Sequence, residues 1–192
     1  RQHDSSEWTK RLPNLLEAKR ANLTGANLTS VDLRGEELSH ARLDLAHLNA
    51  AHLTGTTLRA VSLTGAFLYE AHLNGADLTG ADLTGADLTR AQLRGADLTR
   101  VNLADTRVQH ANLTGAIFEP TQNPPIESIA NARNLDRLRY NDNPKPLTEL
   151  RKAFKDAGFR TAERQVTAAL RRHKPRLWET VLFDWTCEFG AN

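Results

Sequence analysis

The sequence predicts a mainly β repeat solenoid followed by an α-helical tail, and three observations carry this prediction. Residues 21–120 divide into twenty consecutive pentapeptides without a slip of register. Leucine fills the third position of nearly every pentapeptide, and alanine or valine usually fills the first. From Pro146 onward the apolar residues recur at helical spacing instead. One long repeat region therefore sets the fold, and a shorter helical region follows it.

The pentapeptide period suits neither a helix nor a straight strand. On a helix, each leucine would be rotated by about 140° from the last. On a strand, an odd period would place successive leucines on opposite faces. The pattern fits a short extended side followed by a corner. The first and third residues then point inward and the second points outward, while the fourth and fifth, often Thr-Gly, make the turn, because glycine tolerates unusual backbone dihedrals.

The consensus A-[D/N]-L-x-x, repeated in nearly every pentapeptide, makes the chain resemble the pentapeptide-repeat family. The resemblance covers residues 21–120 and implies a right-handed quadrilateral parallel β-helix, in which four pentapeptides form one coil. About five coils are expected, stacked at about 4.8 Å, the spacing of neighbouring strands. The expected core along the axis comprises Leu23, Leu28, Leu33, Leu43, Leu63, Leu78, Leu83, Leu88, Leu98, Leu103 and Phe118.

Four segments are expected along the chain. They are an N-terminal cap (1–20), the β-helix (21–120), a connector rich in Pro and Asn (121–145) and a C-terminal helical hairpin with an aromatic tail (146–192). The cap would cover the first coil with Trp8, Leu12, Leu15 and Leu16, since an uncovered end exposes unpaired backbone groups. Helices are expected from Ile126 to Ala132, from Pro146 to a stop at Gly158, from Thr161 to His173 and from Leu177 to Cys187.

Two stretches of the tail, ELRKAFKDAGFRTAERQVT and LFDWTCEFGAN, resemble the tail of some bacterial pentapeptide-repeat proteins. In those proteins the tail joins the repeat body to a membrane-embedded region. The resemblance implies that this chain is the soluble part of a membrane-anchored bacterial protein, with the bilayer beginning after Asn192. It does not assign the side of the membrane. The alternative is that the tail aromatics pack on the end of the rod or on a second copy, giving a homodimer through the C-terminal helices.

Charge and composition narrow the possible partners. The chain carries 25 basic and 23 acidic residues, a formal charge of +2, whereas residues 21–120 alone carry seven arginines and eleven carboxylates. Neither of these net charges is large enough to predict a nucleic-acid partner. Cys187 is the single cysteine, so neither a disulfide framework nor a cysteine zinc site is expected.

The stacking brings few reactive groups together. His52 and His72 would be neighbours on one face, but two imidazoles without a nearby carboxylate or thiol make a poor metal site. The outside of a rod is convex, and its leucine-filled interior leaves no room for a substrate. Neither enzymatic activity nor a bound cofactor is therefore expected.

The pattern favours a non-enzymatic protein-binding or scaffolding role. Phe67 and Tyr69 are expected to point outward close to arginines, as the anchors of protein interfaces do. Trp178 and Trp185 in the tail would form a second contact surface. The sequence does not name the protein partner.

The alternative function comes from the resemblance. Some members of the family mimic duplex DNA and bind DNA gyrase or topoisomerase, which protects the enzyme from quinolones. Asp77 and Asp97 would stack on one face and supply part of the ordered negative charge that such mimicry needs. The net charge of +2 and the arginines between the carboxylates disfavour this alternative.

Overall fold

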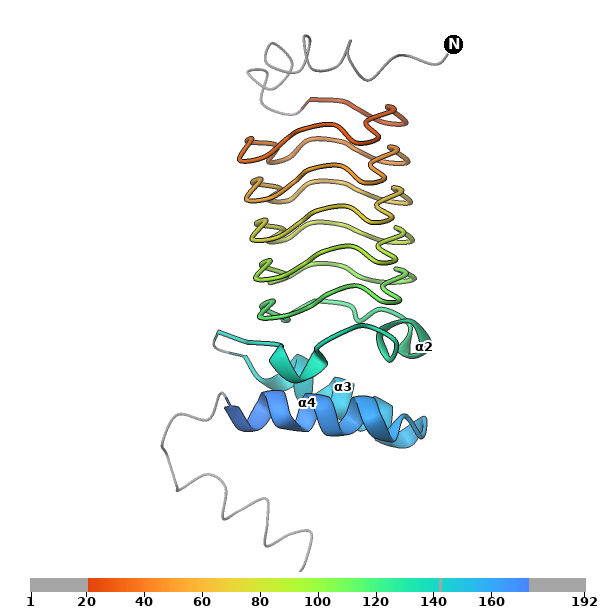
Figure 1. Cartoon of the computed structure of the whole chain (residues 1–192), viewed down its shortest axis with the longest axis vertical. Helices are drawn as coiled ribbons and strands as arrows, with labels where there is room; N and C mark the ends of the chain where they lie inside the picture. The colour runs from red at the N-terminus through yellow and green to blue at the C-terminus, as the bar shows by residue number, and fades with distance from the viewer. Residues whose placement is uncertain (1–20, 142, 173–192) are drawn as a thin grey trace, which may run out of the picture.

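The computed structural model of the chain describes residues 21–141 and 143–172 and consists of stacked coils closed at one end by helices (Figure 1). Parallel β-bridges join residues that are twenty apart in the sequence, as in the series Asn22, Arg42, Ser62 and Asp82. Four such series run along the stack, one for each pentapeptide of a coil. The coil is therefore four-sided, and five coils cover residues 21–120.

Each corner of a coil is a hydrogen-bonded turn. In the first, the N–H of Ala26 donates to the carbonyl of Leu23 at 3.0 Å, and Gly25 adopts a φ of 65°. Every fifth residue from 25 to 115 has a positive φ, but about half of these residues are not glycine. A non-glycine residue in the left-handed region costs roughly 1–2 kcal/mol. The stack therefore tolerates strained backbone at many corners where the sequence has no glycine to indicate a positive φ.

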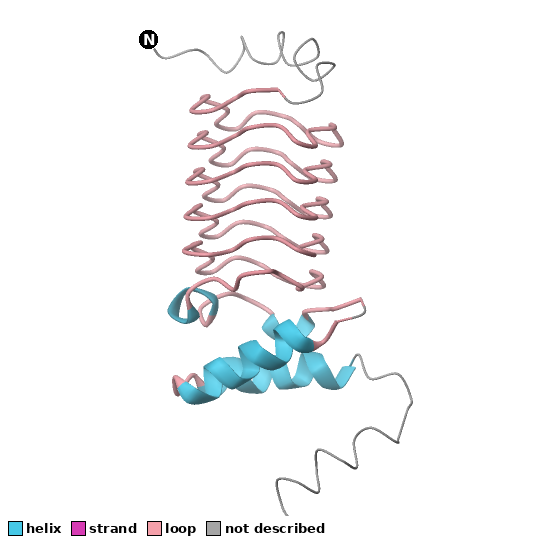
Figure 2. Cartoon of the chain, turned by 180° about the vertical axis from the view of Figure 1, so that it is seen from behind, coloured by secondary structure: helices cyan, strands magenta, loops and turns pink. Residues whose placement is uncertain are grey.

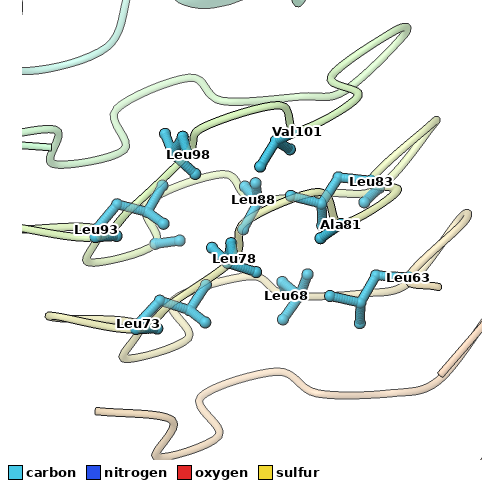
Figure 3. Packing of buried hydrophobic residues seen from close by; sticks show 14 of the residues in the cluster. Leu63, Leu68, Leu73, Leu78, Ala81, Leu83, Leu88, Leu93, Leu98 and Val101 are labelled. Atoms are coloured by element: carbon cyan, nitrogen blue, oxygen red, sulfur yellow. The ribbon is translucent and has the colours of Figure 1, made fainter. Parts of the chain in front are cut away.

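The interior is a continuous column of apolar side chains (Figure 3). Each of the eleven residues expected in the core is 2% exposed or less, and the alanines and valines that fill the first position of most pentapeptides are buried beside them. Thr56 and Thr106 take that first position in two pentapeptides and are also buried. Their hydroxyls donate to the carbonyls of Leu33 and Leu83, at 2.7 and 2.8 Å, so the polar groups are satisfied inside the wall.

Residues 121–140 extend the stack, whereas the sequence predicts a connector with one helix there. Bridges join Asn102 to Gln122, Asn112 to Arg133 and Ile117 to Arg139, so the spacing lengthens from 20 to 21 and 22 residues. Two short helices, α2 (Ile126–Ile129) and η1 (Leu135–Arg137), occupy the extra length. Leu135 and Leu138 are buried and continue the core. The helix expected over 126–132 is thus shorter, and η1 is an addition.

Helices α3 (Lys145–Asp156) and α4 (Arg160–Arg172) form a hairpin across the last coil (Figures 1 and 2). Helix α3 buries Leu147, Leu150 and Phe154, and Gly158 follows its end with a φ of 80°. Both helices lie where the apolar spacing predicts them. In the described part of the chain, no helix combines the length and the hydrophobicity needed to cross a bilayer.

Three expectations fall outside the described residues. They are the N-terminal cap over 1–20, the helix over 177–187 and the contact surface formed by Trp178 and Trp185.

Candidate protein-binding face

The outward side chains of the rod come from the second, fourth and fifth positions of each pentapeptide. The bridge register stacks them in columns, one above the other in successive coils. We call one side of the rod the aromatic face. Its second-position column is Asn27, His47, Phe67, Asp87 and Arg107, and its fourth-position column is Thr29, Asn49, Tyr69 and Thr89. The side opposite to it carries the column Glu37, Thr57, Asp77, Asp97 and Ile117.

A local hydrogen bond explains the frequent Asp or Asn in the second position and Thr in the fourth. The Oδ1 atom of Asp82 accepts from the backbone N–H of Thr84 at 3.0 Å and from its hydroxyl at 2.5 Å. Asn112 makes the same pair of bonds with Thr114, at 3.2 and 2.6 Å. The short polar side chain thus satisfies a turn N–H that the ladder leaves free. Most second-position carboxylates therefore stabilise the wall itself.

An apolar patch interrupts this polar surface. The exposed large hydrophobic residues in the described part of the chain are Leu45, Phe67 and Tyr69, which are 57%, 40% and 37% exposed. Leu45 is the corner residue immediately before the aromatic face, and the other two lie on that face one coil later. The ring of His47 stacks on that of Phe67, with the centroids 4.8 Å apart and the planes 12° from parallel. We call Leu45, His47, Phe67 and Tyr69 the aromatic patch.

Leu45 was missing from the surface expected from the sequence. It occupies the fifth position of its pentapeptide, where glycine is frequent, and holds a φ of 58°. A leucine in a left-handed corner gains nothing from the turn and is fully outside the core. The sequence does contain a signal for this exposed residue, because a large apolar side chain occupies a position that is usually small or polar.

Charged groups border the patch on its far side. The guanidinium of Arg90 lies 5.8 Å from the centroid of the Tyr69 ring, and its Nη1 donates to the Tyr69 hydroxyl at 2.8 Å. The same nitrogen lies 3.3 Å from Oε1 of Glu70. Arg107 and Asp87 form a longer ion pair of 3.9 Å on the same face. Arg90 therefore fixes the orientation of Tyr69 and forms a charged edge of the aromatic patch.

A shallow polar hollow continues beyond Arg90. It is lined by Glu70, His72, Arg90, Gln92, His110 and Arg133. The hollow reaches Arg133 because a backbone bridge joins this residue to Asn112 in the last pentapeptide coil. An apolar centre beside a polar, mainly basic edge is the arrangement found in protein–protein interfaces.

The two histidines expected to be neighbours do stack. The rings of His52 and His72 lie 5.0 Å apart. No group of three or more His, Cys, Asp or Glu side chains comes together as a metal site within residues 21–141 and 143–172. The two histidines form a stacked pair on the side of the rod that follows the aromatic face along the chain.

The acidic residues on the opposite face are largely engaged with neighbours. Asp77 and Asp97 are joined by a bridge, as expected, and Arg59 contacts the Asp77 carboxylate at 2.5 Å. Partial burial of Asp77 opposes its ionisation, but the Thr79 hydrogen bonds and Arg59 outweigh it and lower its pKa. Asp97 accepts from the backbone N–H of Thr99 at 2.9 Å. The negative charge on this face is therefore partly neutralised and not continuous.

The coils and this surface together define a class of protein, a β-helical repeat rod with a candidate binding face. The chain belongs to the pentapeptide repeat family, because the family model described as pentapeptide repeats matches residues 21–59, 41–80, 51–90 and 81–119. No curated protein matches the chain in sequence.

Several solved structures resemble the chain. A pentapeptide repeat protein from the thylakoid lumen of Arabidopsis thaliana is 27% identical, with a TM-score of 0.51 over 60% of this chain and 79% of that one. HetL, a pentapeptide repeat protein involved in heterocyst differentiation regulation in the cyanobacterium Nostoc, is 28% identical, with a TM-score of 0.31 over 63% and 66%. QnrB1, a plasmid-mediated fluoroquinolone resistance protein, is 15% identical, with a TM-score of 0.38 over 62% and 67%. The Arabidopsis structure supports a shared solenoid fold.

Proposed function

We propose that this chain is a non-enzymatic protein-binding or scaffolding module and that the aromatic patch is its contact surface. One observation supports this most. The exposed large hydrophobic residues of the described chain are gathered at one place on the rod, although each coil offers many outward positions. Scattered apolar residues are ordinary on protein surfaces, whereas a gathered patch with a polar rim is typical of binding sites.

The composition of the patch fits this role. Tyrosine and arginine are among the residues that contribute most to binding energy at interfaces, and Tyr69 and Arg90 are already in contact. The wall holds the patch residues in register, because His47 and Phe67 are joined by a backbone bridge as well as by ring stacking. A rigid, preformed surface loses little conformational entropy on binding. The partner we expect therefore offers an apolar side chain to the patch and an acidic group to its basic edge.

The alternative of a DNA mimic that binds gyrase receives less support. Carboxylates on several faces pair with arginines, as in Arg34–Asp32, Arg59–Asp77 and Arg107–Asp87. A continuous negative surface is the property that such mimicry requires. Inhibition of gyrase supercoiling by the purified chain at micromolar concentration would favour this alternative over ours.

The test compares the double variant Phe67→Ser and Tyr69→Ser with the wild type in quantitative affinity capture. The variant Thr57→Ala, on the opposite face, is the matched control, and circular dichroism with thermal unfolding checks that all three fold. We expect recovery of the specific partner to fall at least about tenfold with the patch variant, since each anchor is worth 1 kcal/mol or more. Equal recovery by the patch variant and the control would reject the patch as the contact surface.

A further inference from the structure

A basic stripe runs along the outer side of α4. Its residues line one shallow hollow and recur at helical steps: Arg160, Glu163, Arg164, Thr167, Ala168 and Arg171. The buried residues of the helix are Ala162, Val166 and Ala169. At 3.6 residues per turn, the three arginines lie on the side of the helix opposite to these buried residues. Helix α4 packs against both η1 and α3 at the end of the stack (Figure 1), so the stripe, which lies opposite the buried side of α4, faces away from these two elements.

Much of the charge on this end is uncompensated. Arg160 pairs with Glu163 at 3.6 Å, whereas Arg164 and Arg171 form no ion pair with the described residues. Helix α3 adds Arg151, Lys152 and Lys155, which are exposed and likewise unpaired within the described part of the chain. Residues 145–172 contain eight basic and three acidic residues, a formal charge of +5. The helical end is therefore the basic end of the part of the chain that the structure describes.

The coils carry the opposite charge. Residues 21–120 have a formal charge of −4, and their coils are stacked on one side of the hairpin of α3 and α4 (Figure 1). A negatively charged plane that met α4 would attract the helical end and hold the acidic coils away. The twenty residues after α4 contain Trp178, Phe183, Trp185 and Phe189. Tryptophan is enriched at the boundary between lipid and water, and phenylalanine is common on the apolar side of helices that lie there.

We propose that the α4 stripe docks the helical end onto an anionic lipid surface. This inference is independent of the aromatic patch, which lies on the side of the rod. A basic residue close to an anionic leaflet strengthens binding roughly fivefold. Nucleic acid offers similar phosphate charge, but it lacks the apolar boundary that suits the aromatic residues after α4. Lipid is therefore the partner whose chemistry matches both features.

The test uses the full chain of 192 residues and co-sedimentation with vesicles. One set of vesicles is phosphatidylcholine alone, and the other contains about 30% phosphatidylserine as the source of negative surface potential. We expect binding to the mixed vesicles and little to the neutral ones. The double variant Arg164→Gln and Arg171→Gln should bind roughly 25-fold more weakly. The double variant Arg94→Gln and Arg100→Gln removes the same charge from exposed, unpaired arginines of the described coils and should bind like the wild type.

Three results would overturn the proposal. The first is equal or absent binding to the two kinds of vesicle. The second is the same loss of binding in both double variants, because net charge alone would then explain the attraction. The third is tighter binding to duplex DNA than to the mixed vesicles, removed by the α4 variant, which would assign the stripe to nucleic acid.

Discussion

The side chain of Leu45 covers Gly65, the residue at the equivalent corner of the next coil. A Cβ atom placed on Gly65 would be 2.8 Å from Cδ2 of Leu45, which is closer than carbon atoms approach without displacement. The glycine therefore leaves the space that the leucine occupies. The shape of the aromatic patch depends on this pair of corners as well as on its two rings.

Replacing Gly65 with alanine should alter the patch. Both Gly65→Ala and Gly85→Ala put a side chain on a left-handed corner, with φ of 64° and 67°, and each should cost about 1 kcal/mol of unfolding free energy. Gly85 has open space around it, so only Gly65→Ala should also displace Leu45 and weaken partner binding. Denaturant unfolding measures the first effect and affinity capture the second. Equal binding by the two variants would show that the position of Leu45 is unimportant.

The buried column of leucines should dominate stability. Leu88 is 1% exposed, so Leu88→Ala should lower the unfolding free energy by about 2–5 kcal/mol through lost burial and a cavity. Ala86 is fully buried on the same side of the coil, and Ala86→Leu should cost about 1–3 kcal/mol by overpacking. Leu45→Ala is the control, because it makes the same change at an exposed corner. Similar losses for Leu88→Ala and Leu45→Ala would contradict a solid leucine axis.

The second-position side chain should act mainly as a hydrogen-bond acceptor. Asp82→Ala removes the partner of the Thr84 N–H and hydroxyl and should cost about 1 kcal/mol. Asp82→Asn keeps the acceptor and should stay within about 0.5 kcal/mol of the wild type, since Asn112 makes the same bonds. Urea unfolding of the three proteins distinguishes the cases. If Asn were as costly as Ala, negative charge and not the hydrogen bond would be what the wall requires.

Acid should destabilise the coils through their paired carboxylates. The hydrogen bonds from Arg34 lower the pKa of Asp32 to about 2, from an ordinary value of 3.8. A carboxyl whose pKa is lowered by folding stabilises the protein above its unfolded pKa and loses that effect as the pH falls through its folded pKa. The contribution of Asp32 should therefore be complete above about pH 4 and disappear towards pH 2. The hydrogen bonds to Glu37 and Asp77 act in the same direction.

Unfolding free energies measured from neutral pH to about pH 2.5 test this dependence. Asp32→Asn should show a smaller decrease than the wild type, because it has no carboxyl to protonate. Parallel curves for the two proteins would mean that the Arg34 contact contributes nothing to stability.

The periodic part of the fold could be predicted from the sequence because it follows from local geometry. A five-residue period with leucine in the third position has one consistent solution, in which that residue and the first point inward. The bridge between Asn22 and Arg42 then fixes every later neighbour, including the stacked pair His52 and His72. The outward orientation of Phe67 and Tyr69 follows from the same register.

The structure of residues 121–140 could not be predicted, because the pentapeptide pattern ends before them and so does not fix their bridge register. Between Asn112 and Arg133 the bridge spacing gains one residue, and residues 121–133 do not follow the pentapeptide pattern. Its place in the stack depends on the burial of Leu135 and Leu138, which is a tertiary effect. Leu45 was left out of the predicted surface for a related reason, because its place in the patch depends on its contact with Gly65 in the next coil.

Site-specific photo-crosslinking in the presence of the partner tests the proposed contact surface most directly. A photoreactive side chain would replace Phe67 on the aromatic face or Thr57 on the opposite face. We predict saturable crosslinking from position 67 that unlabelled wild type competes away and the Phe67→Ser, Tyr69→Ser variant does not, with little from position 57. Equal crosslinking from the two positions, or crosslinking from position 57 alone, would contradict the assignment of binding to the aromatic face.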